Sequence, residues 1–430
     1  MYLLYDLILL VAAAVLIPWF VLRGLRHGKV RRGIRERLGL YAADRLTPLA
    51  GRKVIWVHAV SVGETRAAIP LLRALKAAYP QSALVLSNVT ETGHAIAGGI
   101  KEVDLRIFFP FDLSWVVRRV LGRINPSLIV IVETEIWPNF VRLAHQSGIP
   151  VLLVNGRISD RSYPRYRRAR WLFRPILQQF SAFCMQTEQD AERIRGMGAP
   201  PARVEVTRNL KFDMQAALPD PAAAASLRQS LRLPDRASIW VAGSTHAGEE
   251  EVVLDAYRQL VEEGRDLVLV LVPRHPERCR GIGEMLSSRG VPVFLRTAVE
   301  SSARPLAPGE VLLVDTVGEM LKLYAVADLV FVGGSLVAVG GHNILEASLL
   351  KKPVIFGIYM HNFKEISELL LEAGGGIQVT SKAELLSAVR RLLDNDEEGR
   401  RMGERGHALL EANAGATEHT LAVIRRLLGH

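Results

Sequence analysis

Short β-branched runs alternate with amphipathic helical segments over most of this 430-residue chain, and this alternation constrains the fold most strongly. In the first half, the runs Val54–Val60 and Ser127–Val132 flank segments such as Ala67–Tyr79, whose apolar residues recur at helical spacing. A second series begins with strand Ser238–Gly243 and helix Glu249–Glu263. The remaining runs are Ala83–Ser87, Val151–Val154, Leu267–Pro273, Val311–Asp315, Leu329–Val332 and Val354–Phe356. Such alternation predicts parallel βαβ units, and therefore an α/β protein of two tandem Rossmann-like domains facing a cleft.

The expected organisation has five parts, and the last helix is expected to pack back on the first domain. Between the two domains, the chain is rich in Ala, Pro and Asp, as linkers often are. The parts are a membrane anchor helix at 1–22, a basic juxtamembrane segment at 23–50, a first Rossmann-like domain at 51–213, a linker at 214–236 and a second Rossmann-like domain at 237–430.

The net charge of +10 is distributed unevenly. Residues 1–215 contain 31 Lys and Arg against 16 Asp and Glu, so this half carries +15 and the other half −5. A basic half is suited to nucleic acid, a membrane surface or an anionic substrate, and charge alone does not choose among them.

The N-terminal segment Tyr2–Leu22 is almost uninterruptedly apolar. As a helix, it is long enough to cross the ~30 Å hydrocarbon core of a bilayer. Seven basic residues follow it between Arg23 and Arg37, which predicts a cytoplasmic location for the rest of the chain. Because Asp6 and Pro18 interrupt the apolar run, an interfacial or buried helix stays open. Either arrangement predicts a protein at a membrane.

Glu64 follows the first strand directly, in the sequence Ser61-Val-Gly-Glu64. Ligands of open α/β sheets bind outside the carboxyl ends of the strands, so this carboxylate is a candidate catalytic group. The same four residues also form a capping box, in which Ser61 caps the next helix and Glu64 bonds back to the Ser61 amide. Both roles stay open from spacing alone.

Several loops of the second domain are suited to binding an anion. Glycine-rich or polar turns follow four of its strands, at Gly243–His246, Pro273–Glu277, Thr316–Met320 and Gly333–Ala347. Glycines let a phosphate approach the backbone, and helix N-terminal amides favour its charge. Glu346 can accept hydrogen bonds from ribose hydroxyls. The sequence has neither a dinucleotide fingerprint after the first strand of a domain nor a Walker lysine motif, which argues against both sites.

In addition, the chain resembles the 3-deoxy-D-manno-octulosonic acid (Kdo) transferases of lipopolysaccharide synthesis, which are membrane-associated GT-B glycosyltransferases. The resemblance rests on ordered motifs over most of the chain. These are Val57–Glu64, Ser87–Gly93, Phe109–Asp112, Val132–Asn139, Asn155–Ser159, Asn209–Asp213, Pro273–Glu277 and Gly340–Ala347. One departure is Ile344, which stands where the family pattern has proline.

The resemblance implies inverting transfer of Kdo from CMP-Kdo to a phosphorylated lipid A precursor, at the cytoplasmic face of the inner membrane. It assigns Glu64 as the base that activates the acceptor hydroxyl. Glu135 is the second catalytic acid by the family pattern, although its role relative to Glu133 stays open. Lys211 is expected to stabilise the departing CMP.

The second domain is expected to bind the donor and the first domain the acceptor. The implied CMP-binding residues are Pro273, Arg274, His275, Val317, Gly318, Glu319, Asn343, Ile344, Leu345 and Glu346. The expected acceptor-binding residues are Arg157, Arg161, Arg165 and Arg168, in a segment where arginines alternate with aromatic residues. A merely solvated helix face is the alternative for this segment.

We expect no metal, because the sequence has no His/Cys cluster at ligand spacing. No cofactor and no nucleic-acid partner are expected either. Two other functions stay open from the residues. One is another GT-B transferase or a sugar-nucleotide epimerase that uses a uridine nucleotide. The other is a tethered two-lobe solute-binding protein, which the basic residues after the apolar segment disfavour.

Overall fold

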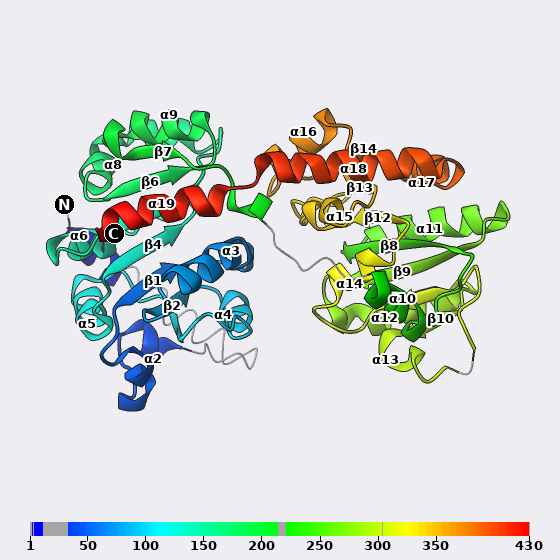
Figure 1. The fold of residues 1–430 in the computed structure, drawn as a ribbon, viewed down its shortest axis with the longest axis horizontal. Helices are drawn as coiled ribbons and strands as arrows, with labels where there is room; N and C mark the ends of the chain where they lie inside the picture. Colours follow the sequence, from blue (N-terminus) through cyan, green and yellow to red (C-terminus); the bar gives the residue numbers. More distant parts are fainter. Residues whose placement is uncertain (1, 3, 12–32, 214–220, 303, 430) are drawn as a thin grey trace. The chain divides into compact units, whose positions relative to one another are not determined.

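The computed structural model describes residues 2, 4–11, 33–213, 221–302 and 304–429 (Figure 1). The chain forms two compact units. Unit 1 comprises residues 1–215 and 413–430, and unit 2 comprises residues 216–412. The chain therefore builds the sheet of unit 1, continues into unit 2 and returns to unit 1 with its last helix.

Unit 1 contains a seven-stranded sheet in the order β3-β2-β1-β4-β5-β6-β7, and all its pairings are parallel. Every residue of β1, β2, β4 and β5 is buried, because helices cover both faces of a parallel sheet. The strands are β1 (Val54–His58), β2 (Ala83–Asn88), β3 (Leu105–Phe108), β4 (Leu128–Val132), β5 (Val151–Gly156), β6 (Ala182–Met185) and β7 (Val204–Val206).

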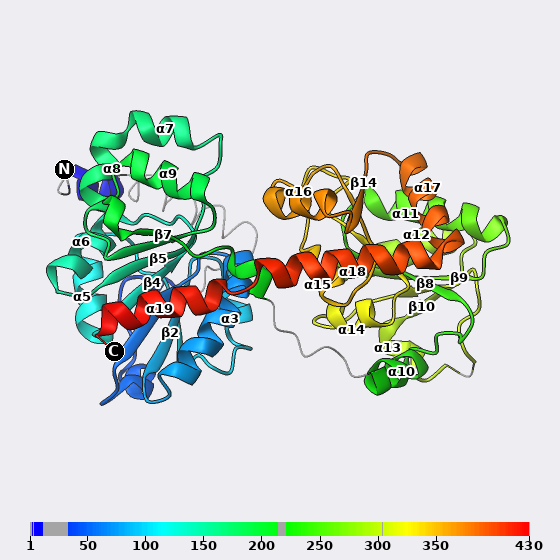
Figure 2. The ribbon, with the colours of Figure 1, turned by 45° about the horizontal axis from the view of Figure 1, so that its top comes forward.

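Two apolar cores enclose this sheet, one on each face. Residues of α5, α6, α8 and α9 pack on the face that contains Trp56, and residues of α3 and α19 pack on the face that contains Ile55 and Val57. The last helix, α19, therefore lies beside α3 within unit 1 (Figure 2). The helices are α2 (Ile34–Arg37), η1 (Ala43–Leu49), α3 (Val62–Ala78), α4 (Glu91–Ala97), α5 (Ser114–Ile124), α6 (Pro138–Gln146), α7 (Tyr163–Arg168), α8 (Arg170–Leu177), α9 (Glu188–Met197), η2 (Pro201–Arg203), η3 (Leu210–Asp213) and α19 (Ala416–Leu428).

Unit 2 contains a second parallel sheet of seven strands, in the order β10-β11-β9-β8-β12-β13-β14. The strands are β8 (Ser238–Thr245), β9 (Leu267–Pro273), β10 (Val293–Leu295), β11 (Val311–Leu313), β12 (Leu329–Val332), β13 (Val354–Gly357) and β14 (Gly376–Val379). The helices are α10 (Pro221–Ser230), α11 (Glu249–Glu262), η4 (Pro276–Arg278), α12 (Cys279–Ser288), α13 (Arg296–Val299), α14 (Met320–Ala325), α15 (Leu345–Leu349), α16 (Lys364–Glu372), α17 (Lys382–Asp394) and α18 (Asp396–Asn413).

The expectation of two parallel α/β domains is confirmed. Each sheet has a switch point, where the order of the strands reverses: between β1 and β4 in unit 1, and between β8 and β12 in unit 2. Ligands of such sheets bind beyond the carboxyl ends of the strands at the switch point. We therefore expect functional side chains at these two places. The segment expected as a linker at 214–236 includes helix α10.

The expected membrane helix Tyr2–Leu22 is not supported. Among the described residues, no helix is long and apolar enough to cross a membrane. Residues 4–11 are helical, and residues 12–22 lie outside the described part of the chain.

Candidate active site

Glu64 lies in the first turn of α3, immediately after β1. Ser61 caps the helix and accepts a hydrogen bond from the Glu64 amide at 3.4 Å. The Glu64 carboxylate accepts one bond from the Val60 amide at 2.7 Å and another from the Ser61 hydroxyl at 2.8 Å. A capping arrangement therefore exists, although the carboxylate bonds to the Val60 amide and not to the expected Ser61 amide.

The surroundings of Glu64 raise its pKa to about 7. Burial is the largest cause, since only 8% of the residue is exposed. The negative charge of Glu133 adds to this effect, and that of Glu135 adds less. The bonds from Ser61 and Val60 oppose the shift. A carboxyl with a pKa near neutrality is suited to accepting a proton and releasing it again at physiological pH.

Glu133 and Glu135 follow β4, which is the neighbour of β1 across the switch point. Glu133 has a left-handed backbone conformation with φ 60°, and its amide donates to the carbonyl of Val154 at 2.8 Å. Burial raises the pKa of Glu135, and the charge of Glu133 raises it further. The structure thus brings Glu64, Glu133 and Glu135 together beyond the carboxyl ends of the neighbouring strands β1 and β4.

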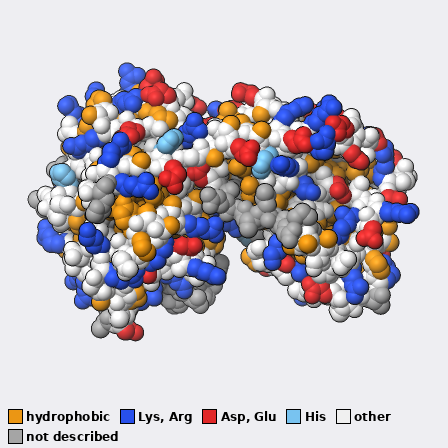
Figure 3. Space-filling model, viewed as in Figure 1, with side chains coloured by type: hydrophobic (Ala, Val, Ile, Leu, Met, Phe, Trp, Pro, Cys, Tyr) orange, Lys and Arg blue, Asp and Glu red, His pale blue; other side chains and the backbone are white. Residues whose placement is uncertain are grey.

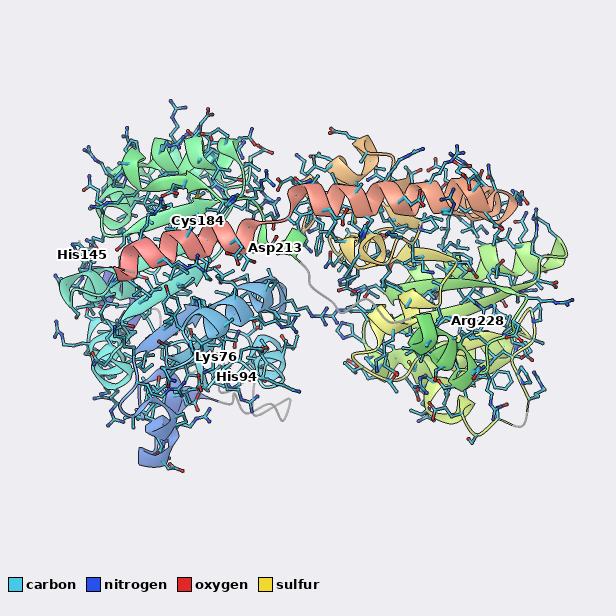
Figure 4. All side chains as sticks on the ribbon, in the orientation of Figure 1. Lys76, His94, His145, Cys184, Asp213 and Arg228 are labelled. Atoms are coloured by element: carbon cyan, nitrogen blue, oxygen red, sulfur yellow. The ribbon has the colours of Figure 1, made fainter. Side chains whose placement is uncertain are left out.

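Lys211 lies in unit 1, where its Nζ forms an ion pair with Glu133 Oε1 at 3.6 Å. The motif around it is fixed at both ends. Asn209 Nδ2 donates to Gln186 Oε1 at 3.0 Å, and the Asp213 carboxylate accepts bonds from amides at the start of α19 (Figure 4). The motif Asn209–Asp213 therefore positions a cation beside the carboxylates.

The four arginines expected to bind the acceptor are not gathered at these carboxylates. Arg157 lies near them through its backbone, because its amide donates to Thr134 Oγ1 at 3.0 Å. Arg161 precedes α7, whereas Arg165 and Arg168 lie on it, and all three are exposed. Lys and Arg side chains are visible over the part of unit 1 where α8 and α9 lie (Figure 3).

In unit 2, the loop after β12 is organised by Glu249, a residue for which the sequence predicted no role. The Glu249 carboxylate accepts bonds from three successive amides, those of Gly334 at 2.6 Å, Ser335 at 2.9 Å and Leu336 at 2.8 Å. A fourth bond comes from the His246 amide at 2.9 Å. Burial raises the pKa of Glu249, and these four bonds oppose the shift.

Three histidines join the loops that follow β8, β9 and β12. His246 stacks on His342 with their Nε2 atoms 2.9 Å apart, and it meets the ring of His275 edge-on at 5.8 Å between centroids. Arg274 directly precedes His275, and its amide donates to the Thr245 carbonyl at 3.0 Å. Pro273 is buried and ends β9. The expected donor residues 273–275 therefore lie beside the glycine-rich loop.

The other expected donor residues occupy two helix N-termini of unit 2. Gly318 has φ 90°, a conformation that suits glycine, and Val317 is 83% exposed. Burial raises the pKa of Glu319, but hydrogen bonds from Thr316 and Arg296 outweigh it and hold the pKa below its usual value.

Asn343 Oδ1 accepts the Leu345 amide at 3.1 Å at the start of α15. Ile344 and Leu345 are fully buried, so neither residue exposes surface to a ligand. Glu346 is half-buried in the first turn of the same helix.

The described residues hold no group of three or more His, Cys, Asp or Glu side chains arranged to bind a metal ion. His58, in contrast to the histidines of unit 2, is fully buried and stacks on Phe109 at 3.8 Å between centroids. Burial lowers the pKa of His58 to about 3. Its surroundings are those of a neutral core side chain.

Known proteins match the chain over its whole length. The family model described as 3-deoxy-D-manno-octulosonic-acid transferase (kdotransferase) matches residues 32–214. The chain is 33% identical to the 3-deoxy-D-manno-octulosonic acid transferase of Haemophilus influenzae over 99% of this chain and 98% of that one. It is 34% identical to the enzyme of the same name from Bordetella pertussis, over 91% of each chain.

A solved structure with the same fold is the S. aureus MnaA–UDP co-structure. Its TM-score is 0.58 at 16% identity, over 88% of this chain and 97% of that one. At this identity the likeness shows the fold alone. The sequence identities to the transferases, in contrast, confirm the resemblance seen in the motifs. The chain is a glycosyltransferase and belongs to the 3-deoxy-D-manno-octulosonic acid (Kdo) transferase family.

Proposed function

We propose that this protein transfers Kdo from CMP-Kdo to a phosphorylated lipid A precursor with inversion, and that Glu64 is the general base. The observation that carries the proposal is the buried Glu64 carboxylate, whose pKa is raised to about 7 at the switch point of unit 1. A sugar hydroxyl is a weak nucleophile, so a base within hydrogen-bond reach lowers the barrier to its attack on the anomeric carbon.

A single displacement inverts the anomeric centre, whereas retention through a covalent intermediate usually needs a carboxylate nucleophile. We assign Glu135 to holding the acceptor or to stabilising cationic character at the sugar. The pKa of Glu135 is raised by burial and by Glu133. Burial raises the pKa of Glu64 most, and the charge of Glu133, which is paired with Lys211, raises it further.

We place the donor at the switch point of unit 2. The departing CMP is anionic, and backbone amides, helix N-termini and Arg274 there favour negative charge. Glu249 supports this role because it holds three amides of the glycine-rich loop in place. Lys211, a residue of unit 1, is the cation that we propose stabilises the negative charge developing on the departing CMP.

We propose that unit 1 binds the acceptor and contacts the membrane. Arg161, Arg165 and Arg168 are exposed, and Trp171 on α8 is 76% exposed. Guanidinium groups bind phosphates in two-pronged contacts, and tryptophan favours the interface between water and lipid. Residues 4–11 add apolar side chains that are 48–60% exposed. The proposed location is the cytoplasmic face of the inner membrane.

The test is to incubate the purified protein with CMP-Kdo and a lipid A precursor, and to measure the mass of the product by mass spectrometry. The expected product carries at least one added Kdo, with inverted anomeric configuration by NMR. The same rate is expected in EDTA, because the proposed mechanism uses no metal. Transfer from a uridine nucleotide sugar but none from CMP-Kdo would contradict the proposal.

A further inference from the structure

The helical residues 4–11 present two unlike sides. Five apolar side chains are exposed, with exposed fractions between 48% and 60%. These are Leu4, Leu7, Ile8, Leu10 and Val11. Asp6 instead bonds to unit 1: its Oδ1 accepts from the Ser114 amide at 3.0 Å and from Asn139 Nδ2 at 2.7 Å.

Tyr2 and Tyr5 make further contacts with the rest of unit 1. The Arg142 guanidinium lies over the Tyr2 ring, 4.5 Å from its centroid, and Gln179 Nε2 donates to the Tyr2 hydroxyl at 3.1 Å. The Tyr5 hydroxyl donates to the Asp112 carboxylate. The segment is therefore held against the rest of unit 1 by these polar contacts and by Leu9, which packs on the apolar core, while its other apolar side chains are exposed.

The partners of Asp6 and Tyr5 belong to a buried network at the N-terminus of α6. The Asp112 carboxylate accepts from the amides of Asn139 at 3.1 Å and Phe140 at 2.8 Å. Asn139 is fully buried, and its Nδ2 also donates to the Asp112 carbonyl at 2.6 Å. We call Asp6, Asp112, Ser114 and Asn139 the Asp6 cluster.

One member of the Asp6 cluster, Asn139, lies four residues after the proposed catalytic acid Glu135. The segment with Glu133 and Glu135 begins where β4 ends at Val132 and ends where α6 begins at Pro138. Its first end is held by the bond between Glu133 and Val154. Its second end is held by the start of α6, which the Asp6 cluster fixes.

We propose that Asp6 is a positioning residue for transfer: by fixing the start of α6, it holds Glu135 in place for the acceptor bound beside Glu64. This inference rests on the proposed function of Glu64 and Glu135. Asn139 Nδ2 donates to Asp112 and to Asp6. Without the Asp6 carboxylate, the second of these bonds is lost, and the start of α6 gains freedom to move. The exposed apolar side chains do not depend on this carboxylate.

The test uses the full-length protein with Asp6→Ala, Asp6→Asn and, as a matched control, Asp44→Ala, since Asp44 is an exposed aspartate of the same unit. For Asp6→Ala, kcat is expected to fall about tenfold, with the KM for CMP-Kdo unchanged and binding to phosphatidylglycerol vesicles unchanged. Asp6→Asn is expected to restore kcat, because its amide oxygen can accept the same two bonds. Wild-type kcat in Asp6→Ala, or equal loss in Asp6→Asn, would overturn the inference.

Hydrogen exchange separates this inference from the proposed function. In Asp6→Ala, the amides of Asn139 and Phe140 are expected to exchange faster than in the wild type, while those of β2 keep their rates. This measurement needs no substrate, so it stands even if the wild type transfers no Kdo. Unchanged exchange at both amides would overturn the inference. If Asp6→Ala loses protection throughout the protein, the same two amides are measured in Tyr5→Phe, which removes only the hydroxyl bond to Asp112 and should also make them exchange faster. Unchanged exchange in Tyr5→Phe would then overturn the inference.

Discussion

Glu64 in unit 1 and Glu249 in unit 2 occupy matching places: each lies in the first turn of the helix that follows the central strand at the switch point. Both are buried, and burial raises the pKa of each. Their partners differ. Glu249 accepts bonds from four backbone amides, whereas Glu64 accepts from one amide and one hydroxyl and has two acidic neighbours.

The difference separates a structural carboxylate from one suited to chemistry. Four amide donors stabilise the ionised form of Glu249 and use its oxygens, so it organises the loop and has little capacity left for a ligand. At Glu64, like charges work against ionisation, and a proton can be taken up near neutral pH. The same fold position thus serves two purposes, according to what the neighbouring strand carries.

The largest expected effect distinguishes these two roles at Glu64. Glu64→Gln is expected to lower kcat by about 10²–10⁴-fold, because the amide still accepts a hydrogen bond but takes no proton. Binding of CMP, measured by calorimetry, is expected to be unchanged. The matched control is Glu91→Gln, an exposed first-turn glutamate of α4, which should retain wild-type turnover. Near-normal turnover in Glu64→Gln would leave Glu64 as a cap.

Glu249→Gln is expected to affect stability and donor binding instead of chemistry. The amide group can satisfy only some of the four donors, and each unsatisfied buried amide costs about 1–3 kcal/mol. We expect a lower melting temperature for unit 2 and a higher KM for CMP-Kdo in the folded protein. Glu251→Gln, an exposed glutamate in the same helical turn, is the control. A large fall in kcat at saturating donor would instead make Glu249 a catalytic group.

A smaller effect is expected for the acceptor. Replacing Arg161, Arg165 and Arg168 together by Gln should raise the acceptor KM on the order of tenfold, since charged hydrogen bonds to phosphate are lost. The KM for CMP-Kdo should not change, and high salt should reduce the difference from the wild type. The control removes three exposed arginines of unit 2, Arg258, Arg280 and Arg391. An acceptor KM equal to that of the wild type would assign this segment to a solvated helix face.

The smallest expected effect is on stability. The pKa of Glu64 is raised from 4.5 to about 7, so its contribution to stability is full below pH 4.5 and is lost as the pH rises through 7. Glu64→Gln removes this loss, and is therefore expected to be more stable than the wild type at pH 8 by an amount on the order of 1–3 kcal/mol. The two proteins should differ less at pH 5. Thermal unfolding at both pH values measures this, and a deficit for Glu64→Gln at pH 8 would show that capping dominates.

Much of the fold was predictable because its central strands are continuous apolar runs. Leu267–Pro273 and Leu329–Val332 have the bounds that the sequence predicts. Edge strands were missed for a physical reason: β10 and β14 are only three and four residues long and are partly exposed. The position of Glu64 at a strand end was also predictable, since it depends only on local sequence.

The partners of the site residues were not predictable in the same way. Asp6 bonds to Ser114 and Asn139, which are 108 and 133 residues away in the chain. Such contacts follow from tertiary packing, so Asp6 was interpreted from sequence only as an interruption of an apolar run. Nothing in the sequence signalled a role for Glu249, because it is the first of three successive acids, Glu249–Glu251, at the start of a helix, where acids are common in any case.

The central claim is that Glu64 is the base and that burial, together with the negative charge of Glu133, raises its pKa. The most direct test is the single-turnover rate of Kdo transfer as a function of pH, in the wild type and in Glu133→Gln. We predict that the wild-type rate falls below about pH 7, and that this fall moves to lower pH in Glu133→Gln because the neighbouring negative charge is gone. A rate that is independent of pH between about 5 and 8, or a fall that stays at the same pH in Glu133→Gln, would contradict the claim.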